Sequence, residues 1–441
     1  MQRQGLRSKA FLVLLSLFFK GILDISYVYL VSPFFSWMPS RYPLAVDGLK
    51  IFESYLLTFG LSLVLPTRVR KPSDFLIALL FIVPVLPTLS LYGLMDGSRT
   101  YTYMLVIAFI IVRGIPIILP LLKIRLVRGG NAIAAWSSIF GVVAALVLLM
   151  TLTGLHFFTL NILDIQQLYT TRERVVASLT KGGLLLNYLQ FWAFYVFMPI
   201  LILSALHYRR YGLFAVLIAL QLLFLGLSAR RGVLLATLIL LGTFVIVERR
   251  SAITIMIGGF LAMVVISFLV AIIGGQFLPG SLIIGRFFFT PARLNYAYHE
   301  FFSKAGFVYL TSTKLPIPLE YPFSDIPERL IGKEIFHSKT VASAGWLATS
   351  YMHFGYLGMI LFAIIIGLLL KIIDSLIYHR MSLRFGVPLA AIPFYSLFTS
   401  ADLTTALLTY GILPIMIMLW FLGSPRIAVY QRNEQCKAVC L

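Results

Sequence analysis

The segment TPARLNYAYHEFF, residues 290–302, gathers side chains that could carry out group transfer. It holds a cation at Arg293, an imidazole at His299 and a carboxylate at Glu300, all among aromatic rings. A guanidinium can bind phosphate oxygens through two parallel hydrogen bonds. An imidazole or a carboxylate can accept the proton of an attacking hydroxyl. Together these residue types suit transfer of a group from a phosphate-containing donor to a hydroxyl.

The remainder of the chain avoids charge. Of its 441 residues, 60% are hydrophobic and 12% are charged, and the mean hydropathy is +0.95. Apolar runs of about 20 residues recur throughout, and each can cross a hydrocarbon core of roughly 30 Å. Segments of alternating polarity, which are typical of a transmembrane β-barrel, are lacking. The pattern predicts an all-α polytopic membrane protein with one integral membrane domain over 1–441 and no cleavable signal peptide.

About twelve transmembrane helices are predicted from these runs. They cover roughly 10–31, 48–66, 75–95, 101–122, 131–153, 184–206, 212–229, 232–247, 252–274, 354–373, 386–401 and 405–423. The last two share one apolar stretch with Asp402 near its middle, which predicts a tight hairpin. Within the first run Lys20 and Asp24 lie one helical turn apart and are expected to form a structural ion pair. Arg113, deep in its span, could tether helices or line a cavity.

Basic residues orient the predicted helices. They recur in the short loops TRVRKPSD, KIRLVRGGN, HYRRYG and ERRS and at both ends of a chain with a formal charge of +20. The positive-inside rule makes these loops and both termini cytoplasmic. Two long loops, 154–183 and 275–353, are then external, which is the periplasm in a bacterium. The tail cysteines Cys436 and Cys440 fall short of the four ligands of a zinc site and are expected to be inert.

The second long loop carries twelve formally charged residues between Arg286 and Lys339. Since each would cost about 3 kcal/mol in lipid, the loop is expected to lie outside the hydrocarbon or to line a wet cavity. Four prolines between 316 and 327 exclude one long helix. We therefore expect short helices and irregular chain on the membrane surface.

A short helix is predicted over 291–304. Thr290 suits the N-cap, Pro291 the first helical position, and Lys304 with Gly306 the C-terminus. Helical spacing then defines two faces, one with Arg293, Tyr296 and Glu300 and another with Asn295, His299 and Phe302. The alternative is an interfacial helix whose charges snorkel and whose rings form an aromatic belt.

Three external elements each present a pair of cations. Arg172 and Arg174 lie in the first long loop, Arg230 follows SA in the turn SARRG, and Arg286 and Arg293 belong to the second long loop. Arginines that converge from three elements at a membrane surface would suit a lipid-linked diphosphate. The alternative is that each is a solvated loop charge.

Several stretches resemble the bacterial O-antigen polymerases, the Wzy-type polymerases of oligosaccharide repeat units. They are Arg172 and Gly183 with ten residues between them, the arginine-rich second loop, AGWLATSYMHFGYLGMILFAIIIGLLLKIID at 344–374 and LFTSADLTTALLTYG at 397–411. Two departures stand out. Neither Arg286 nor Arg293 has the family's spacing to Gly306, and His353 stands where relatives often have asparagine.

The resemblance implies a metal-independent glycosyltransferase with GT-C-type architecture, without a cofactor. It would polymerise undecaprenyl-diphosphate-linked repeat units into O-antigen-type polysaccharide at the periplasmic face of the inner membrane. The growing chain would move from its lipid carrier onto the incoming lipid-linked unit. The implied partners are this lipid-linked oligosaccharide, membrane lipid, a chain-length regulator and other O-antigen assembly proteins, with no nucleic acid.

Within such a reaction the candidate residues divide by charge. The leaving diphosphate needs fixed cations, for which the candidates are Arg172, Arg286 and Arg293, with Arg174 and Arg230 behind them. The attacking hydroxyl needs a base, for which His299 is the first candidate and Glu300 the alternative. Sugar faces could stack on the rings of Tyr296, Tyr298 and Tyr321.

Two other functions share parts of this pattern. An O-antigen ligase would use a similar fold and leaving group but would transfer the glycan to lipid A core. A flippase for lipid-linked oligosaccharide would need a polar cavity open to both sides, hence more charge within its spans. The small number of intramembrane charges favours chemistry at the surface over transport.

The orientation is testable by cysteine labelling. In intact spheroplasts a Glu320→Cys variant is expected to react with an impermeant thiol reagent, because the second long loop is external. Native Cys436 is expected to stay unlabelled until the membrane is opened. The reverse result, with Cys436 labelled and position 320 protected, would invert the predicted topology.

Overall fold

The computed structural model describes residues 2–36, 40–153, 184–228, 230–275, 277–313 and 318–423. Regular structure in these ranges is helical, apart from one isolated bridge between Ala45 and Met95. Nine of the described helices are long and apolar enough to cross a membrane. They are 7–34, 72–94, 99–118, 130–151, 187–207, 211–228, 252–274, 346–377 and 403–421. The prediction of a polytopic α-helical membrane protein is confirmed.

The three other predicted spans also fall on helices, but on shorter ones. They correspond to α3 (Gly48–Val64), α12 (Arg231–Ile246) and α18 (Leu383–Thr399). A count of twelve spans and a GT-C architecture stay predictions. The chain is broken at Asp402, where a hairpin was predicted, because α18 ends at Thr399 and α19 begins at Leu403; the hairpin itself stays a prediction.

The chain divides into two compact units. Unit 1 comprises residues 1–120, 249–372 and 395–404, and unit 2 comprises 121–248, 373–394 and 405–441. The helices of unit 1 are α1 (Gln2–Ser26), α2 (Ser32–Phe34), α3, α4 (Pro72–Leu80), α5 (Leu86–Leu94), α6 (Arg99–Ile118), α13 (Ala252–Gly274), α14 (Phe277–Gly280), α15 (Thr290–Ala305), α16 (Pro327–Glu334) and most of α17 (Trp346–Ile377). Three π-helical segments interrupt them, η1 (Tyr27–Val31), η2 (Phe81–Val85) and η5 (Ser281–Phe289).

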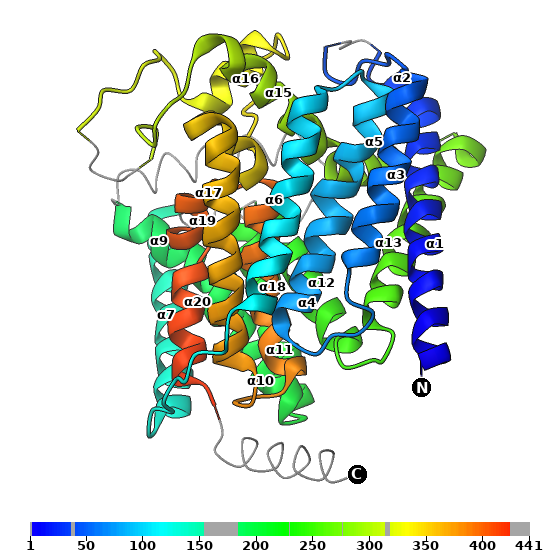
Figure 1. Ribbon diagram of the computed structural model, residues 1–441. Helices are drawn as coiled ribbons and strands as arrows, with labels where there is room; N and C mark the ends of the chain where they lie inside the picture. Colours follow the sequence, from blue (N-terminus) through cyan, green and yellow to red (C-terminus); the bar gives the residue numbers. More distant parts are fainter. Residues whose placement is uncertain are drawn as a thin grey trace. The chain divides into compact units, whose positions relative to one another are not determined.

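The core of unit 1 is the broken helix α4–η2–α5. Its residues 72–94 are fully surrounded by protein, and α5 packs against α1, α3 and α15. Figure 1 shows α1, α3 and α5 running side by side. Close approach is possible because Gly93 has no side chain, since a Cβ there would lie 2.7 Å from the Ile51 backbone nitrogen of α3. A predominantly apolar helix suits this buried central position.

Two intramembrane cations of unit 1, Lys20 and Arg113, are paired with carboxylates. Lys20 Nζ lies 2.7 Å from Asp24 Oδ2, and the Tyr55 hydroxyl donates to the same oxygen at 3.0 Å. The structural ion pair predicted here is confirmed. Arg113 Nη1 lies 3.0 Å from Asp74 Oδ1. Between the two roles left open for Arg113, the structure supports the helix tether, which joins α6 to α4.

One end of unit 1 collects the segments predicted to be external. In Figure 1, α15 and α16 lie beyond the starts of α6 and α17, at the end of the unit opposite to the N-terminus of α1. The second long loop is shorter than predicted, because α17 begins at Trp346 rather than near 354. The helix then kinks where Phe354 and Gly355 leave helical geometry. Gly355 is suited to this kink because its φ of +62° is unfavourable for other residues.

Unit 2 is a second helical bundle. It contains α7 (Gly130–Thr153), α9 (Leu184–Trp192), the π-helical η4 (Ala193–Phe197), α10 (Met198–His207), α11 (Tyr211–Ser228), α12 and α20 (Ile412–Phe421), with the first part of α18. α7 packs against α9, η4, α10 and α20. The predicted span 405–423 is broken between α19 (Leu403–Leu408) and α20, at Gly411 with φ +89°.

Candidate functional site

The helix α15 carries the residues singled out by the sequence. It runs over Thr290–Ala305, close to the predicted 291–304, and ends at Gly306 with φ +92°. The predicted N-cap is wrong, because η5 leads into α15 without a break and Thr290 is itself helical. The Thr290 hydroxyl instead bonds the Gly285 carbonyl at 3.0 Å and the Tyr42 hydroxyl at 2.8 Å. This helix is therefore fastened at its start to the chain around Tyr42.

The two tyrosines of α15 are buried, which conflicts with their expected role of stacking on a sugar. The Tyr296 hydroxyl lies 2.9 Å from Thr102 Oγ1 and donates to the Thr88 carbonyl at 3.2 Å. The Tyr298 hydroxyl donates to the Ala342 carbonyl at 2.9 Å. Both side chains are buried, which raises their pKa values. Their rings pack against protein, so they support the site instead of offering faces to a sugar.

Arg293 is a buried cation with main-chain partners. It is 5% exposed, and its Nε and Nη2 donate to the carbonyls of Arg41 and Ser40, each at 3.2 Å. Nη2 also lies 3.7 Å from Glu300 Oε2, as the shared face predicts. The guanidinium sits 5.4 Å from the centre of the Phe336 ring. Burial lowers the pKa of Arg293, and Glu300 acts in the opposite direction.

A cavity of about 140 Å³ adjoins this arginine. Arg41 and Arg293 are its two cations, and neither is matched by an acidic residue in the lining. Hydroxyl-bearing side chains complete much of the wall, namely those of Tyr42, Thr290, Thr340 and Ser343. Guanidinium and hydroxyl groups are the donors that bind phosphate oxygens in proteins. The composition of the cavity therefore suits a small anion.

Arg41 was missed by the sequence reasoning. It lies between two spans, far from Arg293 along the chain, and has no motif around it. Its guanidinium lies 5.4 Å from the ring centre of Phe35 and 5.9 Å from that of Tyr42. These contacts hold the side chain at the cavity through cation–π attraction. Only the folded chain brings it beside Arg293.

His299 lies on the other flank of α15, as the helical spacing predicts. Its Nε2 is 3.1 Å from the Tyr356 hydroxyl, and its ring packs at 5.0 Å from Tyr101 and 4.8 Å from Tyr351. Burial lowers the pKa of His299, and nearby Glu300 partly offsets this. The imidazole is thus held neutral near pH 7 and can accept a proton. It does not line the cavity at Arg293.

Of the remaining predicted cations, the two that the structure describes, Arg286 and Arg230, do not line this cavity. Arg286 is exposed on η5. Arg230 belongs to unit 2, where its guanidinium lies 4.3 Å from the centre of the Phe191 ring. Arg172 and Arg174, with the rest of 154–183, lie outside the described residues, as do Cys436 and Cys440. Their predicted roles stay predictions.

Two other basic residues at this end of unit 1 are already paired. Lys50 forms an ion pair with Asp96, and Arg99 Nη2 lies 2.9 Å from Glu53 Oε1. Glu53 also accepts a hydrogen bond from the Tyr92 hydroxyl. These contacts join the start of α3 to the turn between α5 and α6. These ion pairs hold the helices together, and their cations are neutralised by carboxylates. Among the described residues, Arg41 and Arg293 are the cations that line one cavity together.

A histidine–aspartate pair lies at the kink of α17. The Leu310 backbone N–H donates to His353 Nδ1 at 3.2 Å, so the imidazole proton is on Nε2, which lies 3.3 Å from Asp402 Oδ1. The other oxygen, Oδ2, accepts bonds from the Thr404 amide and hydroxyl. Although burial raises the pKa of Asp402, the bonds from His353 and Thr404 outweigh it and lower the pKa. Sequence reasoning singled out both residues but not their contact.

Glu328 on α16 is a further titratable group that the sequence did not indicate. Burial raises its pKa, and the charge of Asp402 adds to the effect. A carboxyl group of raised pKa near one of lowered pKa is an arrangement used for acid–base catalysis. Its backbone carbonyl accepts the Ala342 amide, and Ala342 lines the cavity at Arg293. Glu328 is therefore hydrogen-bonded to the same chain segment that lines the cavity at Arg293.

Comparison of the chain with protein-family models, with curated proteins and with solved structures finds no match. The function of the chain is therefore inferred from its own residues. They offer an anion cavity with two arginines, and beside it groups that can exchange protons.

The buried tyrosine bond yields a stability prediction. Tyr298→Phe leaves the buried Ala342 carbonyl without its donor, and we expect a loss of about 1–3 kcal/mol in unfolding free energy. Tyr321→Phe removes a similar bond, to the Asp325 carbonyl, at a half-buried site where water can replace it. It should lower the thermal unfolding temperature of the purified protein by much less. Equal shifts for both variants would contradict the buried role of Tyr298.

Proposed function

We propose that the chain is a membrane glycosyltransferase that polymerises polyprenyl-diphosphate-linked oligosaccharide units at the external membrane surface. The observation that carries the proposal is the cavity in which Arg41 and Arg293 meet without an acidic residue in the wall. A diphosphate leaving group develops negative charge as its bond to the sugar breaks, and fixed cations stabilise that charge. The resemblance to O-antigen polymerases supplies the substrate class.

The mechanism assigns each step to a group. The acceptor hydroxyl oxygen attacks C1 of the donor sugar while the bond from C1 to the phosphate oxygen breaks. The electron pair of that bond leaves with the lipid diphosphate, whose charge Arg293 and Arg41 stabilise. The hydroxyl proton passes to a base. His299 is the first candidate by its neutral imidazole. Glu300 is the alternative if Arg293, 3.7 Å away, does not neutralise it.

Binding of the diphosphate at Arg293 requires little rearrangement of this side chain. Its Nε and Nη2 are already held by the carbonyls of Ser40 and Arg41, so the guanidinium plane has a fixed direction. Among the described residues no acceptor lies within hydrogen-bond distance of its Nη1. A preorganised donor costs no reorganisation during the reaction, which is the basis of its catalytic effect.

The deciding experiment is an assay with the purified full-length protein and lipid-linked repeat units. A ladder of products that differ by one repeat unit is the expected result. Transfer to lipid A core would identify a ligase. Unchanged substrate that only crosses a vesicle membrane would identify a transporter and would refute the glycosyltransferase proposal.

Variants of Arg293 test the diphosphate site. Arg293→Lys keeps the charge but loses the planar fork, so both Arg293→Lys and Arg293→Ala are expected to cut polymer yield by about tenfold or more at equal protein level, equivalent to ~1.4 kcal/mol or more. Lys304→Ala is the matched control, because Lys304 is an exposed cation at the far end of α15. Full activity of Arg293→Ala would remove this residue from the site.

The pH dependence of the rate tests His299. Because burial lowers the pKa of its imidazole below the ordinary 6.5, the base form is present above that lowered value and is lost as pH falls through it. The rate should therefore hold at pH 6.5 and decline at lower pH. His299→Gln should lower turnover roughly 10²–10⁴-fold and abolish this acid limb. If the variant keeps both the turnover rate and the decline of the rate at low pH, the base lies elsewhere, and Glu300 is the next residue to test.

A further inference from the structure

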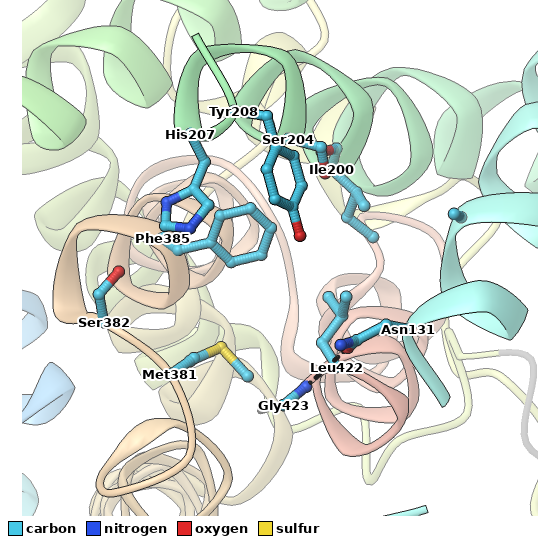
Figure 2. A pocket seen from close by; sticks show the side chains of 11 residues that line it. Asn131, Ile200, Ser204, His207, Tyr208, Met381, Ser382, Phe385, Leu422 and Gly423 are labelled. Atoms are coloured by element: carbon cyan, nitrogen blue, oxygen red, sulfur yellow. Dashed lines mark hydrogen bonds between the residues drawn. The ribbon is translucent and has the colours of Figure 1, made fainter. Parts of the chain in front are cut away.

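A second cavity lies in unit 2, where four of its helices have an end. It measures about 210 Å³ and is formed by the start of α7, the end of α10, the start of α18 and the chain that follows α20. Figure 2 shows the side chains that surround it, with the Tyr208 hydroxyl directed into the space between His207 and Asn131. No residue assigned to the proposed glycosyl transfer takes part in it.

The lining combines apolar surface with hydrogen-bond donors. The ring of Phe385 and the side chain of Met381 supply apolar surface, and the His207 ring packs 5.8 Å from that of Phe385. The side chains of His207, Tyr208 and Ser382 have no hydrogen-bond partner among the described residues. Asn131 Oδ1 accepts a hydrogen bond from the Gly423 amide, which Figure 2 draws as a dashed line at the cavity wall. Mostly apolar walls with a few polar groups are typical of ligand pockets.

Charge at this end of unit 2 is strongly positive. None of the described residues that line the cavity is acidic. Arg209 and Arg210 follow Tyr208 directly and are exposed. Lys123, Arg125 and Arg128 precede α7 at the same end. By the positive-inside rule, this is the cytoplasmic end of the bundle.

We propose that this cavity binds the phosphate group of an anionic phospholipid from the cytoplasmic leaflet. Donor side chains in a lining without an acidic residue can bind phosphate oxygens, and the arginines that follow Tyr208 in the chain supply the opposite charge. Basic pockets between membrane helices at this depth bind anionic headgroups in other proteins. The volume also suits a headgroup better than a larger ligand, for which pockets measure roughly 300–1,000 Å³.

The experiment measures lipid binding to the full-length protein in detergent by native mass spectrometry. The probes are phosphatidylglycerol and phosphatidylcholine with identical acyl chains. Phosphatidylglycerol is expected to bind at least about tenfold more tightly, equivalent to ~1.4 kcal/mol. Equal binding of the two lipids would overturn the proposal.

Matched variants separate the cavity from general attraction to positive charge. Ala135→Phe places a ring in the cavity, since Ala135 lines it. The pair Arg209→Gln and Arg210→Gln removes the two charges that follow Tyr208 in the chain, and the pair Arg125→Gln and Arg128→Gln removes two charges from the segment before α7. Ala135→Phe and the first pair should each weaken phosphatidylglycerol binding about tenfold, and the second pair should change it little. Equal weakening by the two charge pairs, or unchanged binding in Ala135→Phe, would refute the site.

Inorganic phosphate distinguishes the source of the phosphate group. Competition only at concentrations far above those of the lipid supports a membrane-derived ligand. Displacement of the lipid by low millimolar phosphate would overturn the lipid assignment and identify a soluble phosphate site. Thermal unfolding of each variant without lipid verifies that the bundle is intact. Polymer assembly should be retained in Ala135→Phe, since Arg41, Arg293, His299 and Glu300, to which the transfer is assigned, lie in unit 1.

Discussion

The compensation of the Arg293 charge is the constraint on which the organisation of unit 1 at this end depends. An ion removed from water loses several kcal/mol of solvation, and only close polar partners restore it. Arg293 obtains them from the carbonyls of Ser40 and Arg41 and from Glu300. Those bonds fasten the chain between the first two spans to α15. The same chain carries Arg41 and Tyr42, so the contacts that stabilise one guanidinium also assemble the cavity.

The intramembrane ion pairs of this unit differ from Arg293 in the partners of the cation. Lys20 with Asp24 and Arg113 with Asp74 form close ion pairs at 2.7 and 3.0 Å, each with its carboxylate at hand. Arg293 lies farther from its carboxylate, at 3.7 Å, and is bound mainly to main-chain carbonyls. Carbonyls orient a guanidinium but carry no full negative charge. Positive potential therefore remains at Arg293, where a cavity can use it, and is cancelled at the other sites.

The sequence predicted more of the fold than of the site. Hydropathy located the nine described helices that can cross a membrane, and Gly306 marked the end of α15, because these signals are local. The faces of α15 were only partly predicted, because the reasoning assumed a wet side on which Tyr296 and Tyr298 could meet a sugar. The helix is in fact buried from Pro291 through Tyr298. Arg41 and the contact of His353 with Asp402 were missed because both pairings join residues far apart in the chain, which periodicity cannot detect.

The position of Glu300 connects the two flanks of α15. The cavity at Arg293 faces the chain around Tyr42, whereas His299 faces α6 and α17. Glu300 is 51% exposed, contacts Arg293 and adjoins His299 in sequence. A substrate with its diphosphate at Arg293 and its acceptor hydroxyl at His299 would therefore have to pass over this carboxylate. Since the carboxylate would repel a diphosphate placed too far along the helix, Glu300 would define the boundary between the leaving group and the attacking hydroxyl, whichever residue accepts the proton.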